Sequence, residues 1–138
     1  MDYKDIIADA SDKLYGNNKW WPKCFFHFTD VHNAVGILID GKILSRRDAL
    51  AHGRMLSDNA SNRVISNTDE ETLKFARLYF RPRTPTQFHN EGYKPKLVRD
   101  QEINASCPVP VFILLDSAKV LELDDVYFVE KGMAGKAR

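Results

Sequence analysis

The chain has 138 residues, of which 43% are hydrophobic and 28% are charged, and its formal net charge is +1. These ordinary globular values indicate one domain with a hydrophobic core, so disorder is not the default expectation. Cys24 and Cys107 lie far apart and form no CxxC motif, so we expect neither disulfides nor a zinc site. The sequence shows no signal peptide and no apolar run near the ~20 residues of a membrane span, which predicts a cytoplasmic protein.

Residues 2–15 are expected to form the first helix, because their apolar side chains recur at helical spacing. Gly16 ends this helix. The bulky pair Trp20 and Trp21 follows. We expect it to seal an edge of the core, with stacking on a ligand as the alternative.

Residues 24–29 alternate with a period of two, which predicts a strand. Its apolar inner face is formed by Cys24, Phe26 and Phe28. His27 and Thr29 share the other face, roughly 6.5–7 Å apart along the strand.

A short helix is expected directly after this strand. Asp30 is its N-cap candidate, residues 31–38 carry apolar side chains at helical spacing, and Gly41 ends it. His27 and Thr29 therefore lead into the exposed N–H groups of a helix start. A ring nitrogen, a hydroxyl and a helix N-terminus that converge in this way suit a ribose hydroxyl and a phosphate.

The middle of the chain is mostly polar. We expect residues 46–67 to form a long loop with at most a helical turn, and loops of this length are usually functional or mobile. Residues 68–71 match a capping box and predict the start of a short helix. The alternation of residues 76–81 predicts a strand, and residues 86–106 are expected to be irregular.

The last third is expected to hold the central strand. Residues 111–115 are a continuous apolar run, which is typical of a strand buried on both faces. A turn at 116–119 and two short strands at 120–123 and 126–129 are expected to follow. Together these elements predict an α+β fold with a mostly β core and helices in the first third.

Basic residues are in excess in two segments, 42–63 and 81–99. If the segments meet in space, they form a basic face for an anionic ligand, although for any single residue a solvated surface is the simpler interpretation. Arg83 lies between Pro82 and Pro85, which restrict the backbone to extended conformations. A guanidinium on such a stiff segment suits a pyrophosphate or a developing charge, and the alternative is an ordinary surface arginine.

Other chemistries have weaker support. A two-histidine phosphoesterase needs a second His-x-Thr motif on a matching strand, which the sequence lacks. The four histidines are scattered, which disfavours a metal site, and Cys24 lies on the apolar face of its strand rather than beside a base.

Two of these stretches together resemble one family. Residues 27–38 (HFTDVHNAVGIL), with Gly41 and the Leu-Ser-Arg of residues 44–46, are similar to the opening of the DarT toxins, which are single-stranded-DNA ADP-ribosyltransferases. Residues 79–85 (YFRPRTP) are similar to that family's Tyr-Phe-x-Pro-Arg-Ser/Thr-Pro segment. The resemblance runs from about Phe25 to Ala134 in the same order.

The resemblance implies an ADP-ribosyltransferase-like fold, with two small sheets around an NAD cleft, N-terminal helices and NAD as the co-substrate. No metal is implied. By position, His27 and Thr29 would contact the NAD riboses, Asn33 would help line the dinucleotide site, and Arg83 would be the catalytic arginine, which also contacts NAD. The attack would fall on the anomeric carbon of the nicotinamide ribose.

The substrate implied by the resemblance is a base in single-stranded DNA, and the setting is a toxin or phage-defence system with a macrodomain-type antitoxin as partner. The side chains expected to follow the DNA backbone, in a salt-dependent manner, are Arg46, Arg47, Arg54 and Arg63. The alternatives are a catalytically inactive NAD- or nucleic-acid-binding module and a protein-interaction domain with the same fold.

The catalytic glutamate of the family lies beyond the part that this sequence covers. The nearest acids, Glu122 and Glu130, have no matching context. We therefore expect residues 1–138 to be one DarT-like domain or its N-terminal part, as a truncated, split or degenerate form. Such a chain is expected to bind its ligand and to transfer ADP-ribose poorly.

Overall fold

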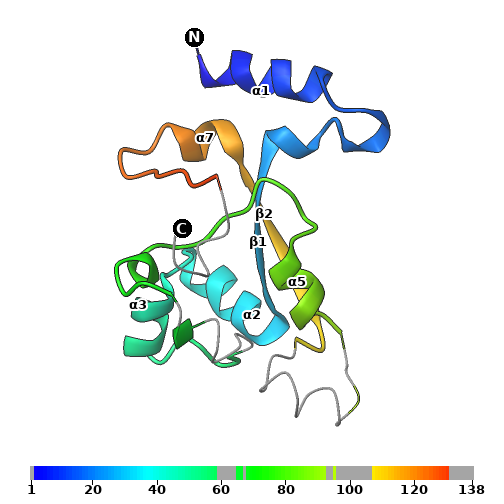
Figure 1. Ribbon diagram of the computed structural model, residues 1–138. Coiled ribbons are helices and arrows are strands. Elements are labelled where there is room, and N and C mark those ends of the chain that lie inside the picture. The colour runs from blue at the N-terminus through cyan, green and yellow to red at the C-terminus, as the bar shows by residue number, and fades with distance from the viewer. Residues whose placement is uncertain (1, 59–64, 67, 93–94, 96–106, 131–138) are drawn as a thin grey trace.

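The computed structural model describes residues 2–58, 65–66, 68–92, 95 and 107–130 (Figure 1). Its elements, with η marking 3₁₀ turns, are α1 (Tyr3–Asp12), η1 (Gly16–Asn18), η2 (Trp21–Lys23), β1 (Cys24–Asp30), α2 (Val31–Asp40), α3 (Arg46–Ala51), η3 (Thr72–Lys74), α5 (Pro85–Asn90), β2 (Pro110–Asp116) and α7 (Ser117–Leu121). The fold is α+β, as the sequence predicts.

The fold is arranged around β1. This strand pairs antiparallel with β2 over all seven of its residues. On its other edge, Phe26 and Tyr79 exchange two backbone hydrogen bonds, at 2.8 and 2.9 Å. β1 is therefore hydrogen-bonded along one edge and at Phe26 on the other, and the strand leads directly into α2.

The core lies on both faces of β1. Phe26 is 1% exposed, and its ring packs against Trp20 at 5.6 Å and Phe112 at 6.4 Å between centroids. Phe25 on the opposite face is also buried and packs edge-on against Phe80 at 5.1 Å. The prediction of a single apolar face is thus wrong at Phe25, because Phe80 covers the second face there. Trp20 does seal the core at Phe26.

Both N-terminal helices form where the sequence predicts them. α1 lies within residues 2–15. α2 begins at its predicted cap, where the Asp30 carboxylate accepts a hydrogen bond from the His32 N–H at 3.0 Å. Gly41 ends α2 with a φ of 66°, a left-handed conformation that glycine adopts without steric cost.

The prediction of a long loop at residues 46–67 is wrong at its start, where the helix α3 forms. The hydroxyl of Ser45 accepts a hydrogen bond from the Asp48 N–H at 3.1 Å and donates one to the Asp48 carboxylate at 2.8 Å. This Ser-x-x-Asp cap lacks the Glu or Gln that usually marks a capping box. A six-residue helix also leaves few positions from which its period can be recognised.

The prediction that residues 86–106 are irregular is wrong at its start, where the helix α5 forms. Thr84 caps this helix by accepting from the Gln87 N–H at 3.2 Å, and Pro85 occupies the first turn, where a missing N–H does no harm. Pro85 therefore begins a helix.

α7 replaces both the turn predicted at 116–119 and the strand predicted at 120–123. The Asp116 carboxylate accepts from the Lys119 N–H at 3.1 Å and starts the helix. Residues 126–129 form no strand either.

The predicted β content is too high elsewhere as well. Of residues 76–81 only Tyr79 pairs, because the chain turns away toward Pro82, which has no N–H to donate. β2 is not buried on both faces, since Leu114 is 49% exposed. The helix start predicted at 68–71 is followed by the 3₁₀ turn η3. Within the described residues there is one two-stranded sheet rather than two small sheets.

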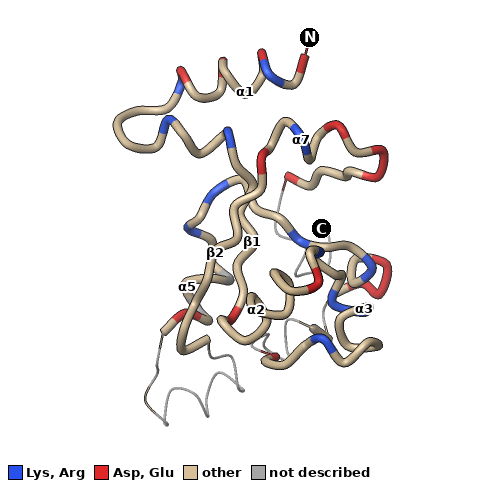
Figure 2. Tube along the Cα trace, turned by 180° about the vertical axis from the view of Figure 1, so that it is seen from behind, with Lys and Arg blue, Asp and Glu red and all other residues tan. Residues whose placement is uncertain are grey.

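The described parts of the two basic segments do not meet. α3 and α5 lie on opposite sides of the β1–β2 sheet in Figure 1 and again in Figure 2, where Lys and Arg are blue. Residues 59–64, 93–94 and 96–99 of these segments lie outside the described residues. The described residues therefore form no common basic face.

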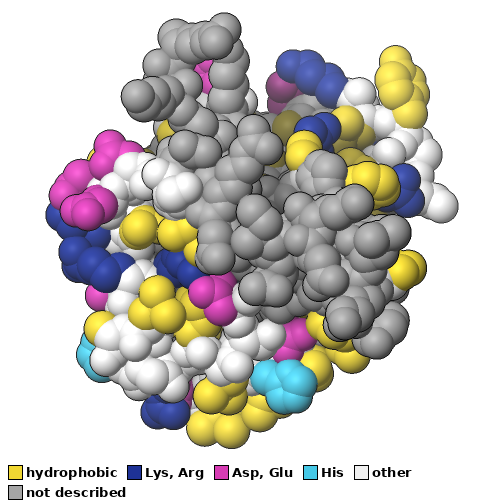
Figure 3. Space-filling model, turned by 60° about the horizontal axis from the view of Figure 1, so that its bottom comes forward, with side chains coloured by type: hydrophobic (Ala, Val, Ile, Leu, Met, Phe, Trp, Pro, Cys, Tyr) yellow, Lys and Arg dark blue, Asp and Glu magenta, His cyan; other side chains and the backbone are white. Residues whose placement is uncertain are grey.

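α2 exposes part of its apolar surface. Val35, Leu38 and Ile39 are all exposed, and hydrophobic side chains gather along the lower edge of the face in Figure 3. Within the described ranges, no helix has both the length and the apolar character that crossing a membrane requires.

Candidate functional site

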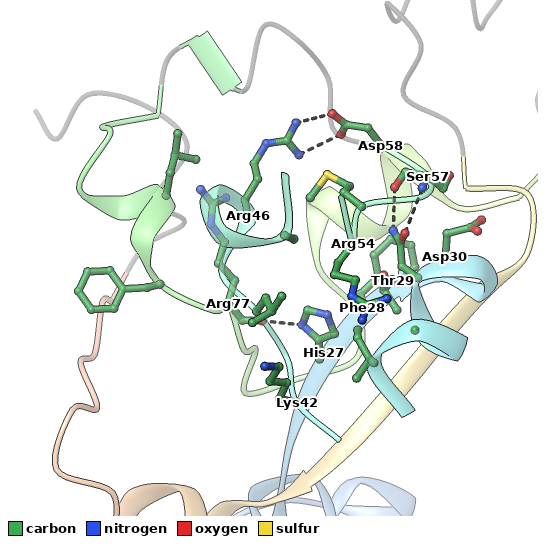
Figure 4. Close-up of a pocket in the computed structure, with 18 of the residues that line it drawn as sticks. His27, Phe28, Thr29, Asp30, Lys42, Arg46, Arg54, Ser57, Asp58 and Arg77 are labelled. Carbon is green, nitrogen blue, oxygen red and sulfur yellow. Dashed lines mark hydrogen bonds and ion pairs between the residues drawn. The ribbon is translucent and has the colours of Figure 1, made fainter. Parts of the chain in front are cut away.

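A cavity of about 230 Å³ is lined by residues of β1, α2 and α3 and by the segment between Thr68 and Tyr79 (Figure 4). His27 and Thr29 both line it, so the structure brings these two predicted residues together. The volume lies slightly below the ~300–1,000 Å³ typical of small-molecule sites. The cavity therefore suits a part of a dinucleotide rather than the whole molecule.

His27 is held in one tautomer. Its Nδ1 lies 3.0 Å from the carbonyl oxygen of Arg77, and a carbonyl can only accept, so Nδ1 donates. Burial lowers the pKa of His27 below its usual 6.5, and the hydrogen bond to Arg77 opposes this only partly. The neutral ring then has a lone pair on Nε2, which can accept a hydrogen bond from a hydroxyl group.

Thr29 offers a second polar group from the same face of β1. It is half-buried, and no described residue forms a hydrogen bond with its hydroxyl. His27 and Thr29 together present one acceptor and one hydroxyl to a ligand. This pairing suits the two adjacent hydroxyls of a ribose.

The start of α2 offers less to a phosphate than the sequence suggests. The Val31 N–H already donates to the Val109 carbonyl at 3.1 Å, and the His32 N–H donates to Asp30. Because these first two N–H groups are engaged inside the protein, the expected anion site at this helix start has little support.

Asp30 is a buried, charged residue of the cavity lining. Burial alone would raise the pKa of Asp30, but its hydrogen bonds from the backbone N–H and the ring of His32 outweigh burial and lower it. The thiol of Cys107 lies 3.7 Å from the same carboxylate. Burial, and next the charge of Asp30, raise the pKa of Cys107 to about 12, so this thiol stays protonated and is no nucleophile.

Asn33 lines the cavity, but its side chain is used inside the protein. Its Oδ1 accepts hydrogen bonds from the Leu56 N–H at 2.9 Å and the Ser57 N–H at 3.0 Å. Its Nδ2 donates to the Ser57 carbonyl at 2.7 Å. Asn33 therefore holds the Leu56–Ser57 segment as a wall of the cavity, and one amide N–H is left for a ligand.

Two of the arginines predicted to follow DNA line the cavity and are paired with carboxylates. Arg46 forms a two-pronged contact with Asp58, one hydrogen bond of which measures 2.9 Å. Arg54 lies 3.0 Å from Asp40. These pairs neutralise both guanidinium groups.

The other two arginines predicted to follow DNA differ from this pair. Arg47 is exposed on α3, lies 3.7 Å from Asp48 and does not line the cavity. Arg63 lies outside the described residues.

Arg83 is not brought to His27. It is exposed and does not line the cavity. It precedes α5, whose last residue, Asn90, does line the cavity, and the six residues of that helix span roughly 9 Å. The catalytic role of Arg83 thus stays a prediction.

Sequence reasoning missed two cations of the site, Lys42 and Arg77. Both line the cavity, and neither forms an ion pair with a described carboxylate. The alternation of residues 76–81 put Arg77 on the same face of the predicted strand as Tyr79. In the structure the pairing of Tyr79 with Phe26 sets Arg77 near the end of β1.

The carboxylates give no free general base in the cavity. Its described lining includes Asp30, Asp40 and Asp58, each of which has a hydrogen-bond or ion-pair partner. Glu122 and Glu130 are exposed and do not line it. The described ranges also contain no group of three His, Cys, Asp or Glu side chains that could hold a metal ion.

Comparison with known proteins gives a family match. The family model described as ssDNA thymidine ADP-ribosyltransferase, DarT, matches residues 26–137. Neither the curated proteins nor the solved structures contain a match.

Proposed function

The chain belongs to the DarT family of ssDNA thymidine ADP-ribosyltransferases, and on this premise we propose that it transfers ADP-ribose from NAD to a thymine base of single-stranded DNA. The observation that carries this proposal is the placement of His27 and Thr29, from the first family-like stretch, side by side in the lining of the cavity.

The cavity fits one part of NAD. We propose that the neutral Nε2 of His27 accepts a hydrogen bond from a ribose hydroxyl and that Thr29 contacts the same sugar. Asn33 acts mainly by holding the Leu56–Ser57 wall in place. The remainder of NAD would extend past the cavity, because about 230 Å³ is too small for a dinucleotide.

In the proposed reaction, the bond between nicotinamide and its ribose breaks, and a bond forms between that ribose carbon and the base. Nicotinamide leaves, and the base loses a proton. Arg83 is the proposed catalytic arginine, acting on the part of NAD outside the cavity. Its position at the far end of α5 from Asn90 agrees with a role outside the cavity.

DNA binding is proposed for the basic side chains Arg46, Arg47, Arg54 and Arg63. Arg47 is exposed on α3. Arg46 and Arg54 would first have to exchange Asp58 and Asp40 for a phosphate, so we expect weak binding that falls steeply with salt. In a bacterial cytoplasm such an activity would act as a toxin or in phage defence, and a macrodomain-type antitoxin is the proposed partner.

A second candidate is an NAD-binding module that does not transfer. It is favoured by the engagement of every described carboxylate in the cavity lining, which leaves no free base for the thymine proton. Binding without turnover would identify this second function.

The two candidates are separated by incubating the chain with labelled NAD and two oligonucleotides of equal length, one containing thymine and one lacking it. Transfer to the thymine oligonucleotide alone is expected. Transfer to both would show that the base is wrong, and NAD binding without transfer would select the second candidate.

A pair of histidine variants ties the result to the cavity. His27→Ala should weaken NAD binding about tenfold, since a half-buried hydrogen-bond partner is lost. His52→Ala is the matched control, because its Nδ1 also lies close to a backbone carbonyl, that of Asp48, at 2.7 Å, but it does not line the cavity. Equal losses in both variants would argue against the ribose role of His27.

A further inference from the structure

The charges that line the cavity are unevenly paired. Its described lining contains four cations and three carboxylates. Asp58 pairs with Arg46, Asp40 pairs with Arg54, and Asp30 is engaged by His32. Arg77 and Lys42 remain, and neither has a partner among the described carboxylates.

The lack of a described carboxylate partner is most informative for Arg77, because of where this residue lies. Its side chain is half-buried in the lining, where a guanidinium with no ion-pair partner among the described residues loses water without gaining a described carboxylate. A guanidinium has five N–H donors in a planar fork, and the group that matches this fork is a carboxylate or a phosphate. The cavity is therefore complementary to an anion at this point.

The neighbours of Arg77 restrict which anion this is. Its own carbonyl accepts the hydrogen bond from His27, so the proposed ribose contact and the guanidinium belong to adjacent parts of one site. Figure 4 shows the backbone of Arg77 beside the ring of His27, with the Arg77 side chain extending up toward Arg46, while Lys42 lies below His27. A ligand that carries a ribose and phosphates offers groups that match an imidazole and two cations.

We propose that Arg77 binds the diphosphate group of NAD in the cavity, with Lys42 as the second cation. This proposal rests on the proposed function, because it assumes a dinucleotide at His27. It places the diphosphate on Arg77 rather than on Arg83, which does not line the cavity, or on the start of α2, whose first two N–H groups are engaged.

The test compares two ligands by calorimetry on the full chain, ADP-ribose with the diphosphate and adenosine without it. Arg77→Gln should weaken ADP-ribose binding tenfold or more and leave adenosine binding within about twofold, since only the charged hydrogen bonds are lost. The backbone carbonyl that orients His27 stays in this variant. Retained adenosine binding also shows that the variant is folded.

Three further variants sharpen the result. Arg77→Lys keeps the charge without the fork and should give an intermediate loss for ADP-ribose. Lys42→Gln should cost about threefold, because Lys42 is exposed and its charge is partly screened. Lys119→Gln on α7 is the matched control; Lys119 is also exposed and has no described ion-pair partner, but it lies outside the cavity lining. No change is expected there.

Each outcome decides a different point. Unchanged ADP-ribose binding by Arg77→Gln, or equal losses for both ligands, would overturn the role of Arg77 while the proposed function stands. If the unsubstituted chain bound neither ligand, both proposals would be wrong.

Discussion

The ring of His27 donates its Nδ1–H to the carbonyl oxygen of Arg77 at 3.0 Å, across 50 residues of sequence. Because the acceptor belongs to the backbone, substitutions of the Arg77 side chain leave this bond in place. The orientation of His27 and the charge of Arg77 can therefore be tested separately.

The first prediction concerns pH. Adenosine affinity should be flat from pH 8 to 6.5 and should fall only below the folded-state pKa of His27, which burial holds below 6.5. Protonated Nε2 carries a hydrogen and cannot accept one from a hydroxyl. Calorimetry with adenosine avoids the titration of phosphates, and His27→Gln should lack this transition. A fall that begins above pH 6.5 would contradict the prediction.

The lower pKa of His27 in the folded protein also makes the free energy of unfolding depend on pH. The unfolded chain takes up its proton near pH 6.5, before the folded chain does, so the free energy of unfolding should decrease as the pH falls from 6.5 toward the folded-state pKa. Above pH 6.5 both states are neutral and this contribution is absent. Urea unfolding of the parent chain and His27→Gln at pH 7.5 and 5.5 should show a smaller decrease in the variant.

The third prediction concerns Asn33. Asn33→Ala removes three hydrogen bonds to the Leu56–Ser57 segment and should lower the free energy of unfolding by about 1–3 kcal/mol. Asn17→Ala, at an exposed position of η1, should change it by less than about 0.5 kcal/mol. Urea denaturation measures both. A small effect at Asn33 would mean that its contacts do not hold the cavity wall.

The fourth prediction concerns the core. Phe26→Ala should destabilise the protein by about 3–5 kcal/mol, because its ring packs on Trp20 and Phe112 and is 1% exposed. Tyr15→Ala is the control, since Tyr15 is 91% exposed. If thermal unfolding gave the same melting temperature for both variants, the described packing of Phe26 would be wrong.

The fifth prediction concerns Cys107. Iodoacetamide at pH 8 should leave Cys107 unmodified in the folded protein, because its thiol is buried and its pKa is about 12. In urea it should react readily. Mass spectrometry of the modified peptides measures both states, and equal rates in the two would contradict the buried position beside Asp30.

The strand–helix unit from Cys24 to Gly41 was predictable from sequence because several local signals agree there. The alternation of β1, the capping carboxylate of Asp30 and the glycine at position 41 all act over a few residues. His27 and Thr29 could be placed on one face for the same reason. Their common placement in a cavity follows from that local geometry.

The rest depends on contacts between distant residues. Nothing local to Arg46 and Arg54 shows that Asp58 and Asp40 neutralise them, and nothing near Arg77 shows that its carbonyl orients His27. The short helices α3, α5 and α7 were missed because caps, rather than a hydrophobic period, define them.

The pairing of β1 with β2 has a consequence for how the protein reaches its folded state. Cys24 lies opposite Asp116, and every described residue that lines the cavity lies between these two residues in the chain. Closing so long a loop carries a large entropic cost and predicts slow folding. During synthesis β1 emerges long before β2, and ligand binding should appear only after Asp116 has been made. Refolding followed by the fluorescence of Trp20, which packs on Phe26 of β1, should therefore show a main phase in the millisecond-to-second range rather than microseconds.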